Sequence, residues 1–150
     1  MPQDAPRVLV VDDDPDVALL VKTVLERRAG CEVAVAHDGQ SAVERLETFT
    51  PDVVVTDIEM PGLDGLELLA ELRRNDPLLP VIVMTAHVSV EYAVSALRAQ
   101  ADEFLTKPLD NLKLVEAVQR LATEGRARRE AGRTKEVAVS YTHLTLPTKA

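Results

Sequence analysis

The chain has 150 residues, a formal net charge of −8 and 46% hydrophobic residues, which fits one globular domain with a short extension. The single cysteine, Cys31, excludes an internal disulfide, and no Cys/His cluster has zinc spacing, so a reducing, cytoplasmic environment is expected. A polar N-terminus and the lack of an apolar run of about 18 residues argue against a signal peptide and a membrane span. Residues 1–124 carry 11 basic and 23 acidic side chains, which argues against direct nucleic-acid binding.

Five short β-branched runs alternate with segments of helical period, which is typical of a parallel α/β fold. The predicted strands are Arg7–Val11, Glu32–Ala36, Asp52–Thr56, Pro80–Met84 and Glu103–Thr106. The first, third and fourth contain continuous valine-rich runs, which indicate strands covered on both faces. The second alternates instead, which predicts an edge strand with Val33 and Val35 facing the core.

Apolar residues at the i, i+3, i+4 and i+7 spacing of a helix follow every predicted strand. They are Val17, Leu20, Val21 and Val24; Gly39, Ala42, Val43 and Leu46; Gly65, Leu68, Leu69 and Leu72; Val90, Ala93, Val94 and Leu97; and Val115, Val118, Leu121 and Ala122. Asp14 before Pro15 predicts the N-cap of the first helix, and Gly30 predicts its end. With right-handed crossovers and the second strand at an edge, we expect a flavodoxin-like, doubly wound (βα)5 fold with strand order 2-1-3-4-5 and helices on both faces.

The domain is expected to span residues 6–122. Residues 123–138 are basic and predict either a linker or an extension of the last helix, in which Gly125 would weaken a rigid helix. Four arginines in this segment are interpreted as a solvated linker rather than a DNA-binding arm: Arg126, Arg128, Arg129 and Arg133. Residues 139–150 lose both charge and period, and we interpret them as a tail of unknown role, such as an appended or read-through sequence.

Ligands of open parallel sheets bind outside the carboxyl ends of the strands, so the residues found there are the candidates for function. The first strand is followed by Asp12, Asp13 and Asp14, and the third, fourth and fifth strands are followed by Asp57, Thr85 and Lys107. Clustered carboxylates stay ionised only beside a cation, and an oxygen-only donor set favours Mg²⁺. Lys107 and Thr85 would bind the oxygens of an anion. The set therefore predicts a phosphoryl group on a nucleophilic carboxylate.

Each of these residues also has a simpler interpretation when it is taken alone. Asp14 is interpreted as a helix cap, and a lone Asp after a strand is commonly turn chemistry. His37 and Asp38 follow the edge strand and are expected to lie too far away to join the site. The joint placement of an acidic pair, a third carboxylate, a hydroxyl and an ammonium at four strand ends is what favours a functional site.

Four motifs in the expected order carry a resemblance to a known family. They are Val-Leu-Val-Val-Asp-Asp-Asp at residues 8–14, Val-Val-Val-Thr-Asp-Ile-Glu-Met-Pro-Gly-Leu-Asp-Gly at 53–65, Val-Ile-Val-Met-Thr-Ala at 81–86 and Phe-Leu-Thr-Lys-Pro at 104–108. Over residues 6–122 the chain resembles the receiver domain of two-component response regulators, which belongs to the CheY-like superfamily.

The resemblance implies a role for each residue of the predicted site. Asp57 would be the phosphoacceptor, taking a phosphoryl group from a phosphohistidine of a sensor histidine kinase or a histidine phosphotransfer protein. Mg²⁺ would be bound by Asp12, Asp13, Asp57 and the backbone carbonyl of Glu59. Lys107 and Thr85 would contact phosphoryl oxygens, and the Lys107–Pro108 peptide bond is expected to be cis.

A switch also follows from the resemblance. Phosphorylation would draw Thr85 toward the phosphoryl group and let Phe104 turn inward, unless Phe104 is simply a core residue. The face from Ser89 to Leu121, formed by helix four, strand five and helix five, would then act on an output domain, a protein partner or a second copy of the chain. Gln100 stands where the family usually has Gly, at the end of helix four. His87 and Glu59 are expected to flank the path along which water would attack the phosphoryl group.

Two other functions compete with a phosphorylatable, non-enzymatic signalling domain. A pseudo-receiver that assembles with partners without phosphorylation is disfavoured by the complete set of site residues. A Mg²⁺-dependent phosphatase is disfavoured because such enzymes usually place the nucleophile after the first strand and add a cap. The cognate kinase, the signal and the kind of output cannot be read from the sequence, although parts of it are similar to receivers that precede AAA+ transcription activators.

Overall fold

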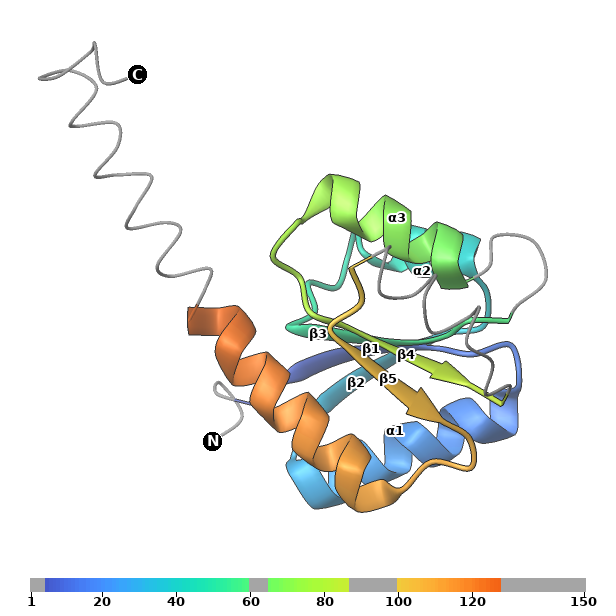
Figure 1. The fold of residues 1–150 in the computed structure, drawn as a ribbon, viewed down its shortest axis with the longest axis vertical. Helices are drawn as coiled ribbons and strands as arrows, with labels where there is room; N and C mark the ends of the chain where they lie inside the picture. Colours follow the sequence, from blue (N-terminus) through green and yellow to red (C-terminus); the bar gives the residue numbers. More distant parts are fainter. Residues whose placement is uncertain (1–4, 60–64, 87–99, 128–150) are drawn as a thin grey trace, which may run out of the picture.

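The computed structural model describes residues 5–59, 65–86 and 100–127 as a parallel sheet covered by helices on both faces (Figure 1). The elements in chain order are β1 (Arg7–Val11), α1 (Pro15–Ala29), β2 (Glu32–Ala36), α2 (Gly39–Arg45), β3 (Val53–Asp57), α3 (Gly65–Asn75), β4 (Val81–Thr85) and β5 (Glu103–Thr106), and a last helix occupies residues 111–127. The strand order is β2-β1-β3-β4-β5, and all neighbours are parallel, as predicted. The predicted fourth helix, His87 and residues 89–99 of the predicted output face lie outside the described residues.

The first helix shows how local signals set the element boundaries. Asp14 is its N-cap, because the side-chain Oδ1 accepts hydrogen bonds from the backbone N–H of Asp16 at 3.0 Å and of Val17 at 3.4 Å. Pro15 occupies the first turn, where its missing N–H has no helical partner to lose. The helix ends at Gly30, whose φ of 64° is a left-handed conformation.

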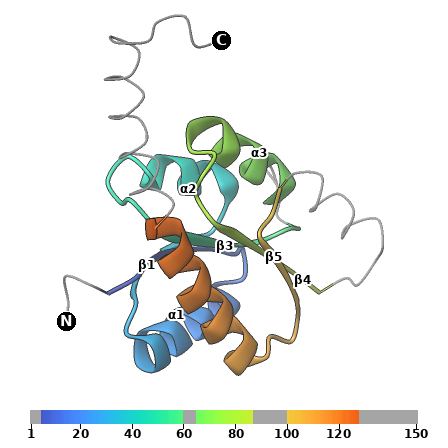
Figure 2. The same cartoon turned by 60° about the vertical axis from the view of Figure 1, so that its left-hand side comes forward.

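Helices lie on both faces of the sheet (Figure 2), and a layer of hydrophobic side chains packs between the sheet and the helices on each face. On one face, strand residues such as Val10, Val55 and Met84 pack with α1 and the last helix. On the other face, Leu9 and Val83 belong to the layer that α2 and α3 complete. Because β1, β3 and β4 are apolar on both faces, the sheet centre is fully buried, and polar side chains gather at the strand ends.

The strand β2 lies at the edge of the sheet as predicted, but side chains on both of its faces are buried at least in part. Val33 and Val35 are only partly buried and pack against the layer of α1, whereas Ala34 and Ala36 are buried in the layer of α2. Val33 and Val35 therefore face the core as predicted, although Ala34 and Ala36 on the other face are more completely buried. The physical reason is that helices cover both faces of β2, so the alternation in side-chain size does not mark a solvent-facing side.

The last helix runs past the end of the predicted domain, through residue 127. Gly125 is buried inside this helix, and the guanidinium of Arg126 forms an ion pair with Asp52. The interpretation of Arg126 as part of a solvated linker is therefore wrong. Among the described helices, none combines the length and apolar composition that crossing a membrane requires.

Candidate functional site at the carboxyl ends of the strands

Four strands place the candidate residues at one edge of the sheet. β3 and β4 each end one residue later than predicted, because the ladder pairs Asp57 with Met84 and Thr85 with Thr106. Asp57 and Thr85 are thus the last residues of buried strands rather than loop residues. Asp12 follows β1 directly and keeps a backbone hydrogen bond from its N–H to the carbonyl of Ala36 at 3.1 Å. The backbones that carry these side chains are fixed by the sheet.

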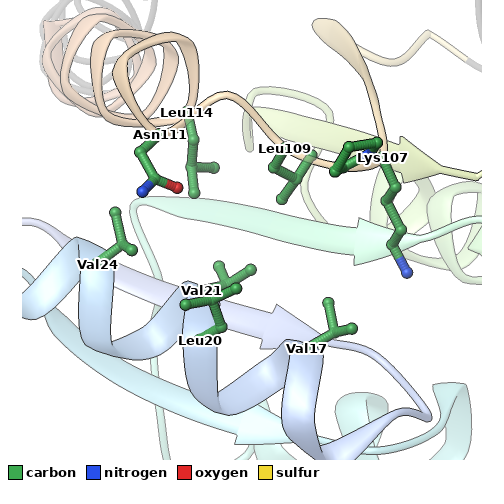
Figure 3. Close-up of a pocket in the computed structure, with 9 residues that line it drawn as sticks. Val17, Leu20, Val21, Val24, Lys107, Leu109, Asn111 and Leu114 are labelled. Carbon is green, nitrogen blue, oxygen red and sulfur yellow. The ribbon is translucent and has the colours of Figure 1, made fainter.

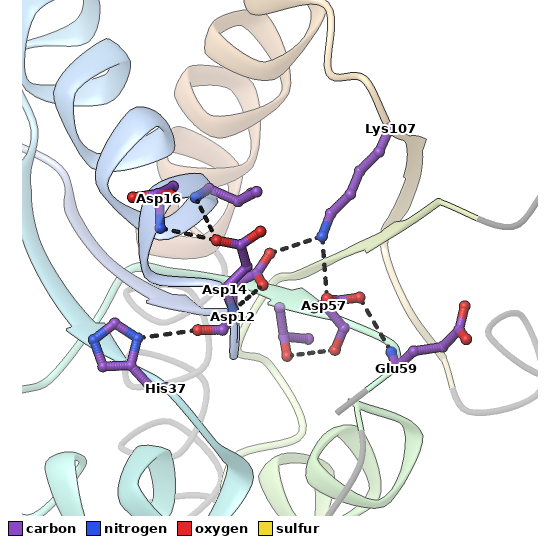
Figure 4. Close-up of polar contacts among 9 residues, drawn as sticks. Asp12, Asp14, Asp16, His37, Asp57, Glu59 and Lys107 are labelled. Atoms are coloured by element: carbon purple, nitrogen blue, oxygen red, sulfur yellow. Dashed lines mark hydrogen bonds and ion pairs between the residues drawn. The ribbon is translucent and has the colours of Figure 1, made fainter. Parts of the chain in front are cut away.

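Lys107 joins the two buried carboxylates of the site (Figure 4). Its Nζ lies 2.8 Å from Oδ2 of Asp12 and 3.1 Å from Oδ2 of Asp57. Asp12 is 0% exposed and Asp57 is 6% exposed. The Lys107 backbone N–H donates to the carbonyl of Thr85 at 2.7 Å, and the Lys107–Pro108 peptide bond is cis. Lys107 follows β5, which is the strand farthest from β1 among the four that carry site residues.

The charges of the cluster oppose one another. Burial raises the pKa of Asp57, and the nearby charge of Asp12 raises it further, against hydrogen bonds from the Glu59 N–H and Lys107 that lower it. Burial alone would lower the pKa of Lys107, but its hydrogen bonds and charge attraction to Asp12 and Asp57 outweigh this and raise it. One ammonium thus faces more negative charge than it can neutralise.

The arrangement of the acidic oxygens fits a hard divalent cation. One carboxylate oxygen from each of Asp12, Asp13 and Asp57 lies within 4.8 Å of the others, with Asp13 exposed and the other two buried. Carboxylates at such a partly open edge leave room for water and for a phosphoryl oxygen, which is the environment Mg²⁺ prefers. Glu59 lies next to this set, and its backbone N–H donates to Oδ1 of Asp57 at 3.1 Å. Its carbonyl as a ligand remains a prediction.

Two residues that support the site were not recognised in the sequence. Nδ1 of His37 lies 3.1 Å from the backbone oxygen of Asp12, although His37 was expected to lie too far away. The pairing of Val11 with Ala36 in β1 and β2 brings the following residues side by side, which sequence spacing does not show. Gly65 approaches so closely that a Cβ there would lie 2.2 Å from the backbone oxygen of Asp57, so a side chain cannot fit.

The residues of the predicted switch have contrasting environments. Thr85 is fully buried. Phe104 is only partly buried and packs against the layer of α2 and α3. Gln100 has a φ of 69°, the left-handed conformation expected at this position, and its carbonyl accepts hydrogen bonds from Arg73 Nη2 at 2.7 Å and Nε at 3.2 Å. The two hydrogen bonds from the Arg73 guanidinium hold the backbone of Gln100 in a conformation that glycine would adopt more easily.

An apolar hollow of about 200 Å³ adjoins the acidic cluster (Figure 3). Lys107 and Pro108 line it at the end near the cluster. The other lining residues come from α1, from the loop after Pro108 and from the start of the last helix: Val17, Leu20, Val21, Val24, Leu109, Asn111 and Leu114. Leu20 at its margin is 60% exposed. The stem of Lys107 therefore contacts an apolar surface, while its ammonium reaches the carboxylates.

Comparison with known proteins gives a consistent family assignment. The response regulator receiver domain family matches residues 8–119. The chain is 41% identical over 140 residues to the transcriptional regulatory protein TrcR of Mycobacterium tuberculosis, covering 93% of this chain and 53% of TrcR. It is 42% identical over 113 residues to the DNA-binding transcriptional regulator NtrC of Escherichia coli, covering 75% of this chain and 24% of NtrC. The chain thus spans about a quarter to a half of these relatives.

Solved structures agree in fold. The receiver domain of the Francisella response regulator 1452 is 39% identical and superimposes with a TM-score of 0.73, over 79% of this chain and 97% of that one. NtrX from Brucella abortus is 36% identical with a TM-score of 0.79, over 87% of this chain and 29% of NtrX. Sequence motifs, strand order and the acidic edge of the sheet all agree with these matches, and the chain belongs to the response regulator receiver domain family.

Proposed function

We propose that this domain is the phosphoacceptor of a two-component phosphorelay and that Asp57 accepts the phosphoryl group. The observation that carries the proposal is the joint contact of Lys107 Nζ with Asp57 and Asp12 beside a third carboxylate. Asp57 ends a buried strand, so the sheet fixes its backbone, and its carboxylate lies close to that of the exposed Asp13. This arrangement suits a carboxylate nucleophile, because the ammonium of Lys107 can offset the negative charge of the incoming phosphoryl group.

The transfer would break the P–N bond of a phosphohistidine and form a P–O bond to Asp57. The imidazole keeps the electron pair of the broken bond and takes up a proton. Lys107 would form an ion pair with a phosphoryl oxygen, because its Nζ already contacts the Asp57 carboxylate at 3.1 Å. Thr85 would donate a hydrogen bond from its hydroxyl to another phosphoryl oxygen. Phe104 would then move toward the space that Thr85 leaves.

Asp12, Asp13 and Asp57 would hold Mg²⁺, with the carbonyl of Glu59 as a further ligand. When it is bound, Mg²⁺ supplies positive charge that offsets the carboxylates and the incoming phosphoryl group. Burial, with a smaller contribution from the charge of Asp12, raises the pKa of Asp57, and a bound cation would favour the ionised carboxylate. The oxygen donors present are the kind that this cation requires.

The partners follow from the position of the site. A histidine kinase or phosphotransfer protein must reach Asp57 at the carboxyl edge, and the apolar hollow beside Lys107, with exposed Leu20, offers contact area there. The output would use the face of helix four, β5 and the last helix, on an attached domain, a separate protein or a second copy. We place the domain in the cytoplasm and assign it no separate substrate, so its chemistry is limited to Asp57.

Phosphoryl uptake tests this proposal directly. The chain is incubated with phosphoramidate and Mg²⁺, and intact mass spectrometry measures whether one phosphoryl group is added. Asp57→Asn should abolish the addition, whereas Asp14→Asn, an exposed neighbour whose capping function Asn can serve, should retain it. Labelling of Asp57→Asn at the level of the parent chain would refute Asp57 as the acceptor.

A second measurement separates a switch from a pseudo-receiver. Amide NMR spectra with Mg²⁺ are compared before and after addition of beryllofluoride, which imitates the phosphoryl group on Asp57. Shifts near Asp57, Thr85 and Lys107 that extend to Phe104 are expected. A folded chain that binds Mg²⁺ but shows no change would favour a protein-interaction module that acts without phosphorylation.

A further inference from the structure

A second charged cluster lies at the opposite edge of the sheet, where the strands begin. Asp52 is 7% exposed, and its Oδ2 accepts hydrogen bonds from the backbone N–H of Arg7 at 2.9 Å and from Nη2 of Arg126 at 2.8 Å. The same Nη2 donates to the backbone oxygen of Ala5 at 2.9 Å. Arg126 thus joins the last helix to the chain entering β1 and to the residue preceding β3.

Gly125 brings the same helix against the residue preceding β4. A Cβ on Gly125 would lie 2.8 Å from Cγ and 3.0 Å from Cδ of Pro80, and 3.4 Å from the backbone oxygen of Asp52. A proline ring next to backbone cannot move aside easily, so glycine is what permits this approach. Glycine is otherwise unfavourable inside a helix, by about 1 kcal/mol relative to alanine, and the close packing gives its presence a physical reason.

Gly125 and Arg126 lie beyond the residues that the family model matches, whereas Asp52 and Pro80 lie within them. The match ends at residue 119, whereas the helix continues through residue 127 and returns to the sheet. In Figure 2 the last described turn of this helix lies beside the start of β1, in agreement with the contact of Arg126 with Ala5. The domain core and the helix end are therefore connected by an additional contact.

We propose that Gly125, Arg126 and Asp52 form a clasp that holds residues 121–127 of the last helix in one orientation on the sheet. A segment attached beyond this helix would then leave the domain in a defined direction, and Arg126 and Gly125 are its positioning residues. The inference rests on the proposed function only in treating such a segment as a route for the output. The clasp itself is independent of phosphorylation.

Hydrogen exchange in the full chain tests the clasp, because two substitutions on the same helix should act in opposite directions. Thr123→Ala adds helix propensity at an exposed position, so exchange of the amides in residues 121–127 should slow slightly. Gly125→Ala adds more propensity but places a Cβ against Pro80, so exchange there should become at least about tenfold faster. A free helical extension would respond to both substitutions with slower exchange.

Arg126→Gln supplies the second arm, with Lys113→Gln as the control for loss of one positive charge from an exposed position of the same helix. Arg126→Gln should accelerate exchange in residues 121–127 by at least about tenfold, and Lys113→Gln should leave it unchanged. Amides of β1 and β3 report global stability in every variant, and they should exchange as in the parent.

The proposal is overturned if Gly125→Ala or Arg126→Gln leaves exchange in residues 121–127 at or below the parent rate. It is also overturned if the strand amides accelerate by the same factor, since the variant would then only have lost global stability. All of these measurements use the unphosphorylated chain. Failure of the clasp would therefore leave the phosphoacceptor role of Asp57 untouched, and a chain that takes up no phosphoryl group could still show the clasp.

Discussion

Replacement of Lys107 by Met should destabilise the domain in Mg²⁺-free buffer. Methionine keeps an unbranched apolar stem against the hollow beside α1, so the substitution removes mainly the ammonium. Asp12 and Asp57, which are 0% and 6% exposed, would then face each other without a counter-charge. Removing one partner from a buried ion pair typically costs about 3–5 kcal/mol.

The contacts of Lys107 indicate where in this range the loss of stability should lie. Lys107 makes two charged hydrogen bonds, at 2.8 and 3.1 Å, and its side chain is 18% exposed, so water partly replaces the lost contacts. We therefore expect a loss near the lower limit, about 3 kcal/mol in the free energy of unfolding. With a denaturant slope of about 2 kcal/mol per molar urea, the unfolding midpoint should fall by about 1.5 M.

Urea unfolding of five chains, namely the parent, the two single variants at 107 and 57, their double variant and a Lys113→Met control, separates this effect from packing. In the Asp57→Asn background a single buried carboxylate remains uncompensated, so Lys107→Met should cost about half as much there. Lys113→Met, on the exposed side of the last helix, should change stability by less than about 0.5 kcal/mol. A loss below about 1 kcal/mol for Lys107→Met, or an equal loss with and without the Asp57 charge, would refute the assignment of Lys107 as the counter-charge.

Three further predictions concern local features. Gln100→Gly should raise the free energy of unfolding by up to about 1 kcal/mol, because φ is 69° there, whereas Gln40→Gly in α2 should lower it by a similar amount; equal signs in urea unfolding would contradict this reasoning. Burial, with smaller contributions from nearby acidic charges, raises the pKa of Cys31 from 9.0 to about 11. The folded state therefore holds the thiol proton more tightly, and stability should fall as pH rises from 9 toward 11, an effect that unfolding curves of Cys31→Ala should lack. Gly65→Ala should lower stability by about 1–3 kcal/mol and slow phosphoryl uptake, since its Cβ would displace the backbone of Asp57; parent-like stability and uptake would argue against the close approach.

Much of the fold and the site was predictable because the relevant signals are local. Valine-rich runs separated by helical periods specify parallel strands, and an alternating second strand places that strand at an edge. Once the strands are parallel, every residue after a strand lies at the same edge of the sheet. The convergence of Asp12, Asp57 and Lys107 follows from this topology, although only the structure supplies the contacts of 2.8 and 3.1 Å.

The strand order, the helix caps and the edge at which the acidic residues meet were therefore all predictable from local sequence signals. The three-dimensional packing was needed to show that His37 reaches Asp12, that helices cover both faces of β2, and that Arg126 binds Asp52 from 74 residues away. These contacts depend on strand register and on how far a helix slides and rotates on its sheet. Hydrophobic periodicity fixes which face of a helix is buried but not which single side chains meet across that face, so long-range polar contacts escape a reading of the sequence.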